Sequence, residues 1–225
     1  MDDMTIRADT CGPLGIAPGK LAALVGARMC HDLVSPLGAI GNGLELLQMS
    51  DEFRALSGSP ELALIADSVE AARARVRWFR LAFGQASRDQ RLASAELARL
   101  LMDAERGGRL RIRLEAEGDL PRIEARLIVL AVMCLETALP WGGSLLVCRG
   151  ATGWRLVAEA ARTRPDPALW AWLDASAQRH GSEPSAAEVH FPILAGLAEQ
   201  DGQIILWNLD EKGAEIAFQP APSPT

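Results

Sequence analysis

The sequence predicts an α+β protein, in which a helical hairpin is followed by a sandwich of helices packed on one face of a mixed or antiparallel sheet. In positions 17–86 the apolar residues recur with helical spacing in two long segments. Over positions 90–219, short alternating segments are interspersed with apolar helical segments, which is typical of a sheet covered by helices. The chain has 225 residues, 49% of them apolar, so it can bury a sizeable core. Positions 1–16 and 220–225 are expected to be tails.

The hairpin consists of two predicted helices joined by a polar break. The first helix is expected from Ala17 to about Met49. The second is expected from Pro60 to about Phe83, because proline suits the first turn of a helix and Ser59 can accept a hydrogen bond as its N-cap. Gly84 is a natural end to this helix.

The second half is predicted to contain four helices and five strands. Helices are expected over 94–105, 122–139, 167–180 and 185–200, and strands over 109–117, 144–150, 154–160, 203–210 and 214–220. Pro192 is expected to kink or break the last helix. The second and third strands are expected to form a hairpin, as are the fourth and fifth, because only short turns separate the members of each pair.

Composition and charge argue against several classes of function. The net charge of −6 makes nucleic acid an unfavourable general partner, since phosphate binding needs basic surface. The sequence has no apolar run long enough to cross a membrane, and its acidic first residues are unlike a secretory signal, so a cytoplasmic protein is expected. The cysteines at 11, 30, 134 and 148 form no CxxC pair and accompany three histidines, so buried thiols are expected and no metal site.

His31 lies on the first helix, opposite its main apolar face. That face is formed by Leu21, Val25, Met29, Leu33, Leu37, Ile40, Leu44 and Leu47. The side of the helix that carries His31 also carries Arg28, Ser35, Gly38 and Asn42, which are small or polar. His31 is therefore expected to be exposed on a surface to which a partner can dock.

The second helix has an apolar stripe, with Arg73, Arg77 and Arg80 together on one flank. These arginines suit an acidic or phosphorylated partner, but they also suit a solvated face with no role. Two helices with one apolar stripe each need further helices to bury them. The simplest source is a second copy of the chain, so a homodimeric four-helix bundle is expected.

The segment from His31 to Ile40, HDLVSPLGAI, resembles the phosphoacceptor box of sensor histidine kinases, H-[ED]-L-x-[ST]-P-L-x-x-I. In that box a histidine is followed at once by an acid, here Asp32, and five residues later by a proline, here Pro36. The proline lacks the N–H that would bond to the carbonyl of Asp32, and it is expected to bend the helix beside His31.

The second half resembles the ATP-binding domain of these kinases in its order of elements, but not in its nucleotide-binding residues. Met133 and Thr137 stand where the kinases have two asparagines, and methionine is a poor ligand for magnesium. Glu159 takes the place of an aspartate, and the glycines that follow it in kinases are missing, with Ala161 at one of these places. A degenerate domain that uses no ATP is expected, with magnesium needed only in the partner.

Together these features resemble the ChpT family of histidine phosphotransferases of alphaproteobacteria. The resemblance implies that His31 takes a phosphoryl group from the receiver-domain aspartate of a hybrid kinase. It then passes the group to response-regulator receivers such as CtrA and CpdR. Asp32 is expected either to orient the ring or stabilise its charge by a hydrogen bond, or else to contact the edge of a receiver. Ser35 either bonds near the phosphoryl group or bonds back to its own helix. The alternatives are an ATP-dependent histidine kinase and an adaptor that binds receivers without accepting phosphate.

Overall fold

The computed structural model describes residues 18–49, 59–87, 89–107, 110–150, 152–174 and 184–222. The predicted tail 1–16 lies outside them. The helices are α1 (Pro18–Met49), α2 (Pro60–Phe83), α3 (Ser94–Gly107), α4 (Arg122–Ala138), α5 (Pro167–Trp170) and α6 (His190–Gln200), with a 3-10 turn at Ala171–Leu173. The strands are β1 (Arg91–Ala93), β2 (Leu110–Glu115), β3 (Asp119–Pro121), β4 (Gly143–Arg149), β5 (Trp154–Glu159), β6 (Gln203–Leu209) and β7 (Gly213–Pro220). None of the helices within these ranges has the length and apolar character needed to span a bilayer.

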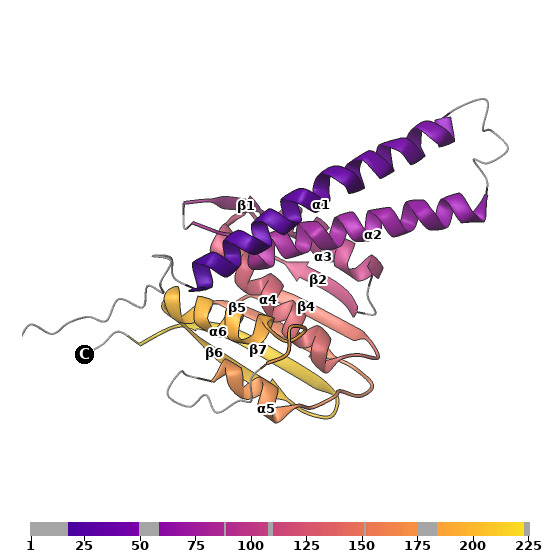
Figure 1. The fold of residues 1–225 in the computed structure, drawn as a ribbon. Coiled ribbons are helices and arrows are strands. Elements are labelled where there is room, and N and C mark those ends of the chain that lie inside the picture. The colour runs from indigo at the N-terminus through magenta and orange to yellow at the C-terminus, as the bar shows by residue number, and fades with distance from the viewer. Residues whose placement is uncertain are drawn as a thin grey trace, which may run out of the picture.

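The two long helices α1 and α2 form the predicted hairpin, whose ends at Met49 and Pro60 project beyond the α/β half (Figure 1). The predicted N-cap of α2 is confirmed, because the Ser59 hydroxyl accepts a hydrogen bond from the Leu62 amide at 3.1 Å. Gly84 ends α2 as predicted. A Cβ at this glycine would lie 2.3 Å from the Arg80 carbonyl oxygen, so a larger residue would strain this end.

The main sheet has five strands in the order β2-β4-β5-β7-β6. It is mixed, because β2 pairs parallel with β4, whereas the other three pairings are antiparallel. Both predicted hairpins, β4–β5 and β6–β7, are present. The separate pair β1–β3 was not predicted, because its strands have only three residues each and so show no recognisable alternation.

The core lies between one face of the sheet and the helices α4 and α6. Strands β5 and β7 alternate buried and more exposed residues, with Leu156, Ile216 and Phe218 fully buried, which is the pattern of a sheet covered on one face. Helix α4 is buried almost all round, and every residue from Ala125 to Leu135 except Arg126 is buried. This explains why its sequence shows an apolar run.

The last turns of α2 belong to the same core as α4. Trp78, Leu81 and Ala82 are buried in the cluster that α4 and the sheet also form, and α2 packs on both α3 and α4. The Arg126 guanidinium donates from Nε to the Ala82 carbonyl at 2.8 Å. The hairpin is thus joined to the α/β half through the second of its helices.

Two helix predictions need correction. The helix predicted over 167–180 ends at Leu173, and Asp174 has extended backbone, while 175–183 lie outside the described residues. The Asp174 carboxylate instead accepts a hydrogen bond from the Trp207 indole at 2.8 Å, which competes with continuation of the helix. The helix predicted over 185–200 begins only at His190, so Pro192 lies in its first turn, where a missing N–H costs nothing, and does not kink it.

Candidate functional site

The imidazole of His31 projects from α1 into solvent, with 82% of its side chain exposed. Its Nδ1 lies 3.4 Å from Oδ1 of Asp32, and the other carboxylate oxygen of Asp32 accepts from Nε of Arg28 at 2.8 Å. The three side chains thus form a row on one face of the helix, because Arg28 and Asp32 are one turn apart. His31, Asp32 and Arg28, all predicted from the sequence, come together here.

The pKa of the Asp32 carboxyl is lowered, first by the contact with His31 and then by Arg28. Asp32 is therefore ionised at neutral pH and can only accept hydrogen bonds. A carboxylate facing Nδ1 favours the imidazole tautomer with its proton on Nδ1. In that tautomer the lone pair is on Nε2, the nitrogen that points away from Asp32.

A hollow of about 400 Å³ opens beside the ring of His31. It lies where α1, the end of α2 and the start of α4 meet, and it is lined by Ala27, His31, Val34, Ser35, Arg80, Gly84, Gln85 and Arg122. Ser35 and Arg80 were predicted as functional residues, but Arg122 and Gln85 were not. Nothing in the local sequence of Arg122 marks it, because it reaches the hollow only through the packing of α4 against α2.

The three arginines of α2 differ in their partners, although Arg73 and Arg77 both lie near Glu70, and their role in partner binding stays a prediction. Arg77 bonds to Asp103 of α3 at 3.0 Å. Arg73 pairs with Glu70 at 3.2 Å and reaches α1, where the missing Cβ of Gly41 makes room for its guanidinium. Of the three, Arg80 lines the His31 hollow.

Gly38 and Asn42 lie further along α1 from His31. Asn42 is exposed, and a Cβ at Gly38 would have no neighbour within 4 Å. Both leave the surface of α1 open on this side. Their role in partner binding stays a prediction.

Met133 and Thr137, which stand in place of the kinase asparagines, are bonded to each other and to α6. The Thr137 hydroxyl donates to the Met133 carbonyl at 3.0 Å and lies 3.3 Å from Nε2 of His190. His190 is buried, and burial lowers its pKa from 6.5 to about 4, so the ring is neutral at physiological pH. The side of α4 where kinases place nucleotide ligands is thus packed with protein side chains.

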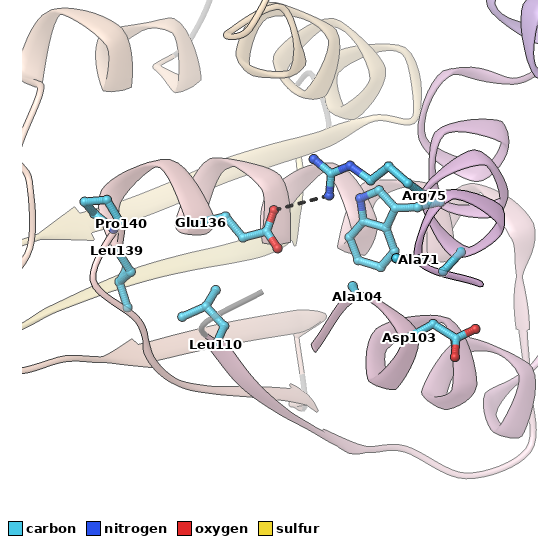
Figure 2. A pocket seen from close by; sticks show the side chains of 10 residues that line it. Ala71, Arg75, Asp103, Ala104, Leu110, Glu136, Leu139 and Pro140 are labelled. Carbon is cyan, nitrogen blue, oxygen red and sulfur yellow. Dashed lines mark ion pairs between the residues drawn. The ribbon is translucent and has the colours of Figure 1, made fainter. Parts of the chain in front are cut away.

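A second hollow, of about 430 Å³, separates the hairpin from the end of α4 (Figure 2). Arg75 of α2 reaches across it to Glu136 of α4, with 4.0 Å between the charged groups, and Asp103 lies at its rim. Burial raises the pKa of Glu136, and Arg75 opposes this rise. Carboxylates outnumber cations here, which is the opposite of the charge balance beside His31.

The described part of the chain has no group of three or more His, Cys, Asp and Glu side chains placed to bind a metal ion. Cys30 and Cys134 are buried free thiols, as expected, whereas Cys148 is only half-buried. The pKa of both buried thiols is raised by desolvation. Cys11 lies outside the described residues.

Comparison with known proteins places the α/β half in a family. The sequence profile of the family described as "Histidine phosphotransferase C-terminal domain" matches residues 94–213, more than half of the chain. The protein phosphotransferase ChpT of Brucella abortus (strain 2308) is 33% identical over 137 residues, which are 60% of this chain and 63% of that protein. The chain thus spans less than two thirds of the length of that relative.

One solved structure extends the likeness in fold to most of the chain. A bacterial phosphotransferase solved at 1.7 Å superposes with a TM-score of 0.63 at 24% identity, covering 91% of this chain and 98% of that one. The histidine kinase domain of the EL346 blue-light activated kinase from Erythrobacter litoralis has a TM-score of 0.46 at 15% identity, over 84% of this chain and 94% of that one. From the family profile and its extent, the chain belongs to the histidine phosphotransferase family.

Proposed function

We propose that the protein is a phosphotransferase of a two-component phosphorelay, with His31 as the phosphoryl carrier. The observation that carries the proposal is the exposed His31 ring, whose Nδ1 faces the ionised Asp32 and whose Nε2 is left as the nucleophile. Membership of the histidine phosphotransferase family supports the reaction class, although the family profile covers residues 94–213 and not His31.

The reaction needs little from this chain besides the placement of the ring. Nε2 attacks the phosphorus of a receiver's aspartyl phosphate, and the P–O bond breaks with its electron pair left on the carboxylate. In the second step a carboxylate oxygen of another receiver attacks the same phosphorus, and the N–P bond breaks with its pair returned to Nε2. The Nδ1 proton stays against Asp32 throughout, so no proton needs to be moved.

Labelling from a phosphorylated receiver domain tests the proposal directly. The protein should take up phosphate in an acid-labile, alkali-stable form, as expected for phosphohistidine, and His31→Ala should take up none. Asp32→Asn should still be labelled, but more slowly, because the neutral amide favours the tautomer with its proton on Nδ1 less strongly than the carboxylate does. Equal labelling of His31→Ala and the unmodified protein would exclude His31 as the carrier. Receiver binding without any labelling would favour the adaptor.

We propose that this chain does not phosphorylate itself with ATP. Met133, Thr137 and His190 fill the side of α4 that would carry nucleotide ligands, and they offer one hydroxyl where two amides would be needed. Calorimetric titration with magnesium and ATP should therefore show no binding. Binding of ATP together with label transfer to His31 would support the kinase alternative.

The expected partners are receiver domains, those of a hybrid kinase and of CtrA-like and CpdR-like regulators. Partners of this kind would place the protein in the cytoplasm. The α/β half lies beside the helix that carries His31 and widens the surface available to a receiver (Figure 1).

We also propose that the working form is a homodimer joined through the hairpins. The predicted apolar face of α1 is only partly covered: Leu44 is buried, but Val25, Met29, Leu33, Ile40 and Leu47 are exposed, and on α2 so is Ile65. A second hairpin would bury these residues in a four-helix bundle. Light scattering after gel filtration should give the mass of a dimer, and Ile40→Glu should give a monomer. Leu206→Glu, which places the same charge on an exposed sheet residue, is the control and should remain dimeric.

A further inference from the structure

We infer that Arg80 and Arg122 form a binding site for the phosphoryl oxygens, facing His31 across the hollow between α1, α2 and α4. This inference rests on the proposed function and deepens it. It assigns to the α/β half a direct part in the reaction, because Arg122 is the first residue of α4. The ligand is the phosphoryl group itself, whether it is on His31 or arriving on a receiver.

The charge of the hollow fits an anion. Its lining residues include two arginines, Gln85 and Ser35, and no aspartate or glutamate. This local excess of positive charge occurs in a chain whose net charge is −6. A phosphoryl group carries about −1.5 to −2 charges, which two arginines can match. Each guanidinium can also form two parallel hydrogen bonds to phosphoryl oxygens.

Arg80 differs from the other arginines on its flank of α2. Arg73 and Arg77 are held by carboxylates, those of Glu70 and Asp103. No carboxylate within reach holds Arg80 in the described part of the chain, and its charge acts instead on Cys30, the residue before His31, where it opposes the burial that raises the thiol pKa. Arg80 therefore brings an available positive charge to α1 at the level of the phosphoacceptor.

Arg122 is placed by the joint between α4 and α2. The Arg122 amide donates to the Gln90 carbonyl at 2.8 Å, and one turn later Arg126 donates to the Ala82 carbonyl, also at 2.8 Å. These two bonds fix the first turn of α4 next to the last turn of α2, on which Arg80 lies. The N-terminal end of α4, where the helix dipole is positive, lies at the hollow and adds to the positive electrostatic potential there.

Both steps of the relay pass through a phosphoryl group whose negative charge is spread over three oxygens. Guanidinium groups set around the phosphorus stabilise that charge while the P–O or N–P bond breaks, in either direction. Arg80 and Arg122 are therefore expected to raise the rate of transfer to and from His31. They need not change how tightly a receiver binds, since the receiver brings its own contacts.

Phosphoramidate is the probe that separates this site from receiver docking, because it donates a phosphoryl group and carries no receiver surface. In this reaction the N–P bond of phosphoramidate breaks, Nε2 of His31 forms a new N–P bond, and ammonia leaves with a proton from water. The rate of His31 labelling should fall at least about tenfold in Arg80→Gln and in Arg122→Gln. Arg122→Lys should recover part of the rate, because lysine keeps the positive charge. The recovery should be incomplete, because lysine cannot form the two parallel hydrogen bonds of a guanidinium group.

Arg111→Gln is the matched control, since Arg111 is exposed on β2 away from the hollow, and its rate should be unchanged. Receiver affinity, measured by calorimetry, should stay within about twofold in Arg122→Gln. An Arg122→Gln protein that is labelled at the normal rate overturns the inference while leaving His31 as the carrier. A loss that Arg122→Lys does not relieve, together with a lower melting temperature, shows a structural role and also overturns it. An unmodified protein that takes no label from either donor overturns both proposals.

Discussion

Arg126 of α4 and Ala82 of α2 are joined by a hydrogen bond of 2.8 Å from the guanidinium Nε to the backbone carbonyl. Ala82 is completely buried, and the arginine is half-buried, so that desolvation lowers the pKa of its guanidinium. A cation bonded to the last turn of a helix favours that end of the helix, where the carbonyl groups carry partial negative charge. This bond adds to the packing of Trp78, Leu81 and Ala82, which joins the hairpin to the core of the α/β half.

Replacing Arg126 with methionine should lower the free energy of unfolding by about 1–3 kcal/mol, because a buried carbonyl loses its partner. The loss is limited, since removing a buried charge also removes its desolvation cost. Urea unfolding checks this, with Arg111→Met as a surface control that should shift the free energy by less than about 0.5 kcal/mol. An unchanged midpoint for Arg126→Met would mean that water satisfies the carbonyl equally well.

Trp78 should be the most sensitive residue of α2. It is 1% exposed and lies in the core cluster, so Trp78→Ala should cost about 3–5 kcal/mol of unfolding free energy. Its indole N–H has no hydrogen-bond partner, so Trp78→Phe should cost much less than Trp78→Ala. Trp141 is exposed and stacks on Arg162 at 3.7 Å, so Trp141→Ala should cost less than about 1 kcal/mol. Equal losses at the two tryptophans would contradict this placement of the core.

Two glycines should respond to alanine in opposite ways. Gly153 has φ +152°, and a Cβ there would lie 2.1 Å from the Phe218 carbonyl, so Gly153→Ala should destabilise the protein by more than about 1 kcal/mol. Gly196 lies inside α6 with nothing within 4 Å of a Cβ. Gly196→Ala should therefore stabilise by about 0.5–1 kcal/mol through helix propensity. Thermal melting of both variants is the measurement, and a stabilising Gly153→Ala would be incompatible with the close approach of β7.

Stability should fall as the pH drops from 7 to 5 because of His190. Its pKa is about 4 in the folded chain and 6.5 when solvated, so the unfolded chain binds the proton first and acid favours unfolding. The expected loss between pH 7 and pH 5 is about 2 kcal/mol, with full stability above pH 6.5.

Glu136 acts in the opposite sense, since its pKa is raised and the folded chain holds that proton more tightly. The measurement is therefore a difference in slope between the unmodified protein and His190→Gln, because Glu136 contributes equally to both. The variant should lose less stability on acidification. Parallel slopes would show that His190 is solvated in the folded protein.

The sequence predicts local features well in this chain. Ser59, Pro60 and Gly84 mark the limits of α2 because a cap, a first-turn proline and a terminal glycine act within one turn of the helix. The exposure of His31 followed from the wheel for the same reason: its neighbours lie on its own helix. These are effects of short range.

Features that depend on packing between distant segments could not be predicted from the sequence. Arg122 reaches the His31 hollow because α4 packs on α2, and Arg77 finds a partner in Asp103 of α3 because α3 packs on α2. The end of the helix at Leu173 is set partly by Trp207, a residue of a strand much later in the chain. In each case the partner residue lies far away in the sequence, where no local pattern can indicate it.

The last turn of α2, which packs in the core with α4, has a consequence for truncated forms of the chain. A chain cut between β3 and α4 would still display the imidazole and its acidic neighbour, but it would lack the guanidinium of Arg122 and the support that holds Ala82. Such a fragment could offer a histidine to a visiting receiver and yet exchange little with it.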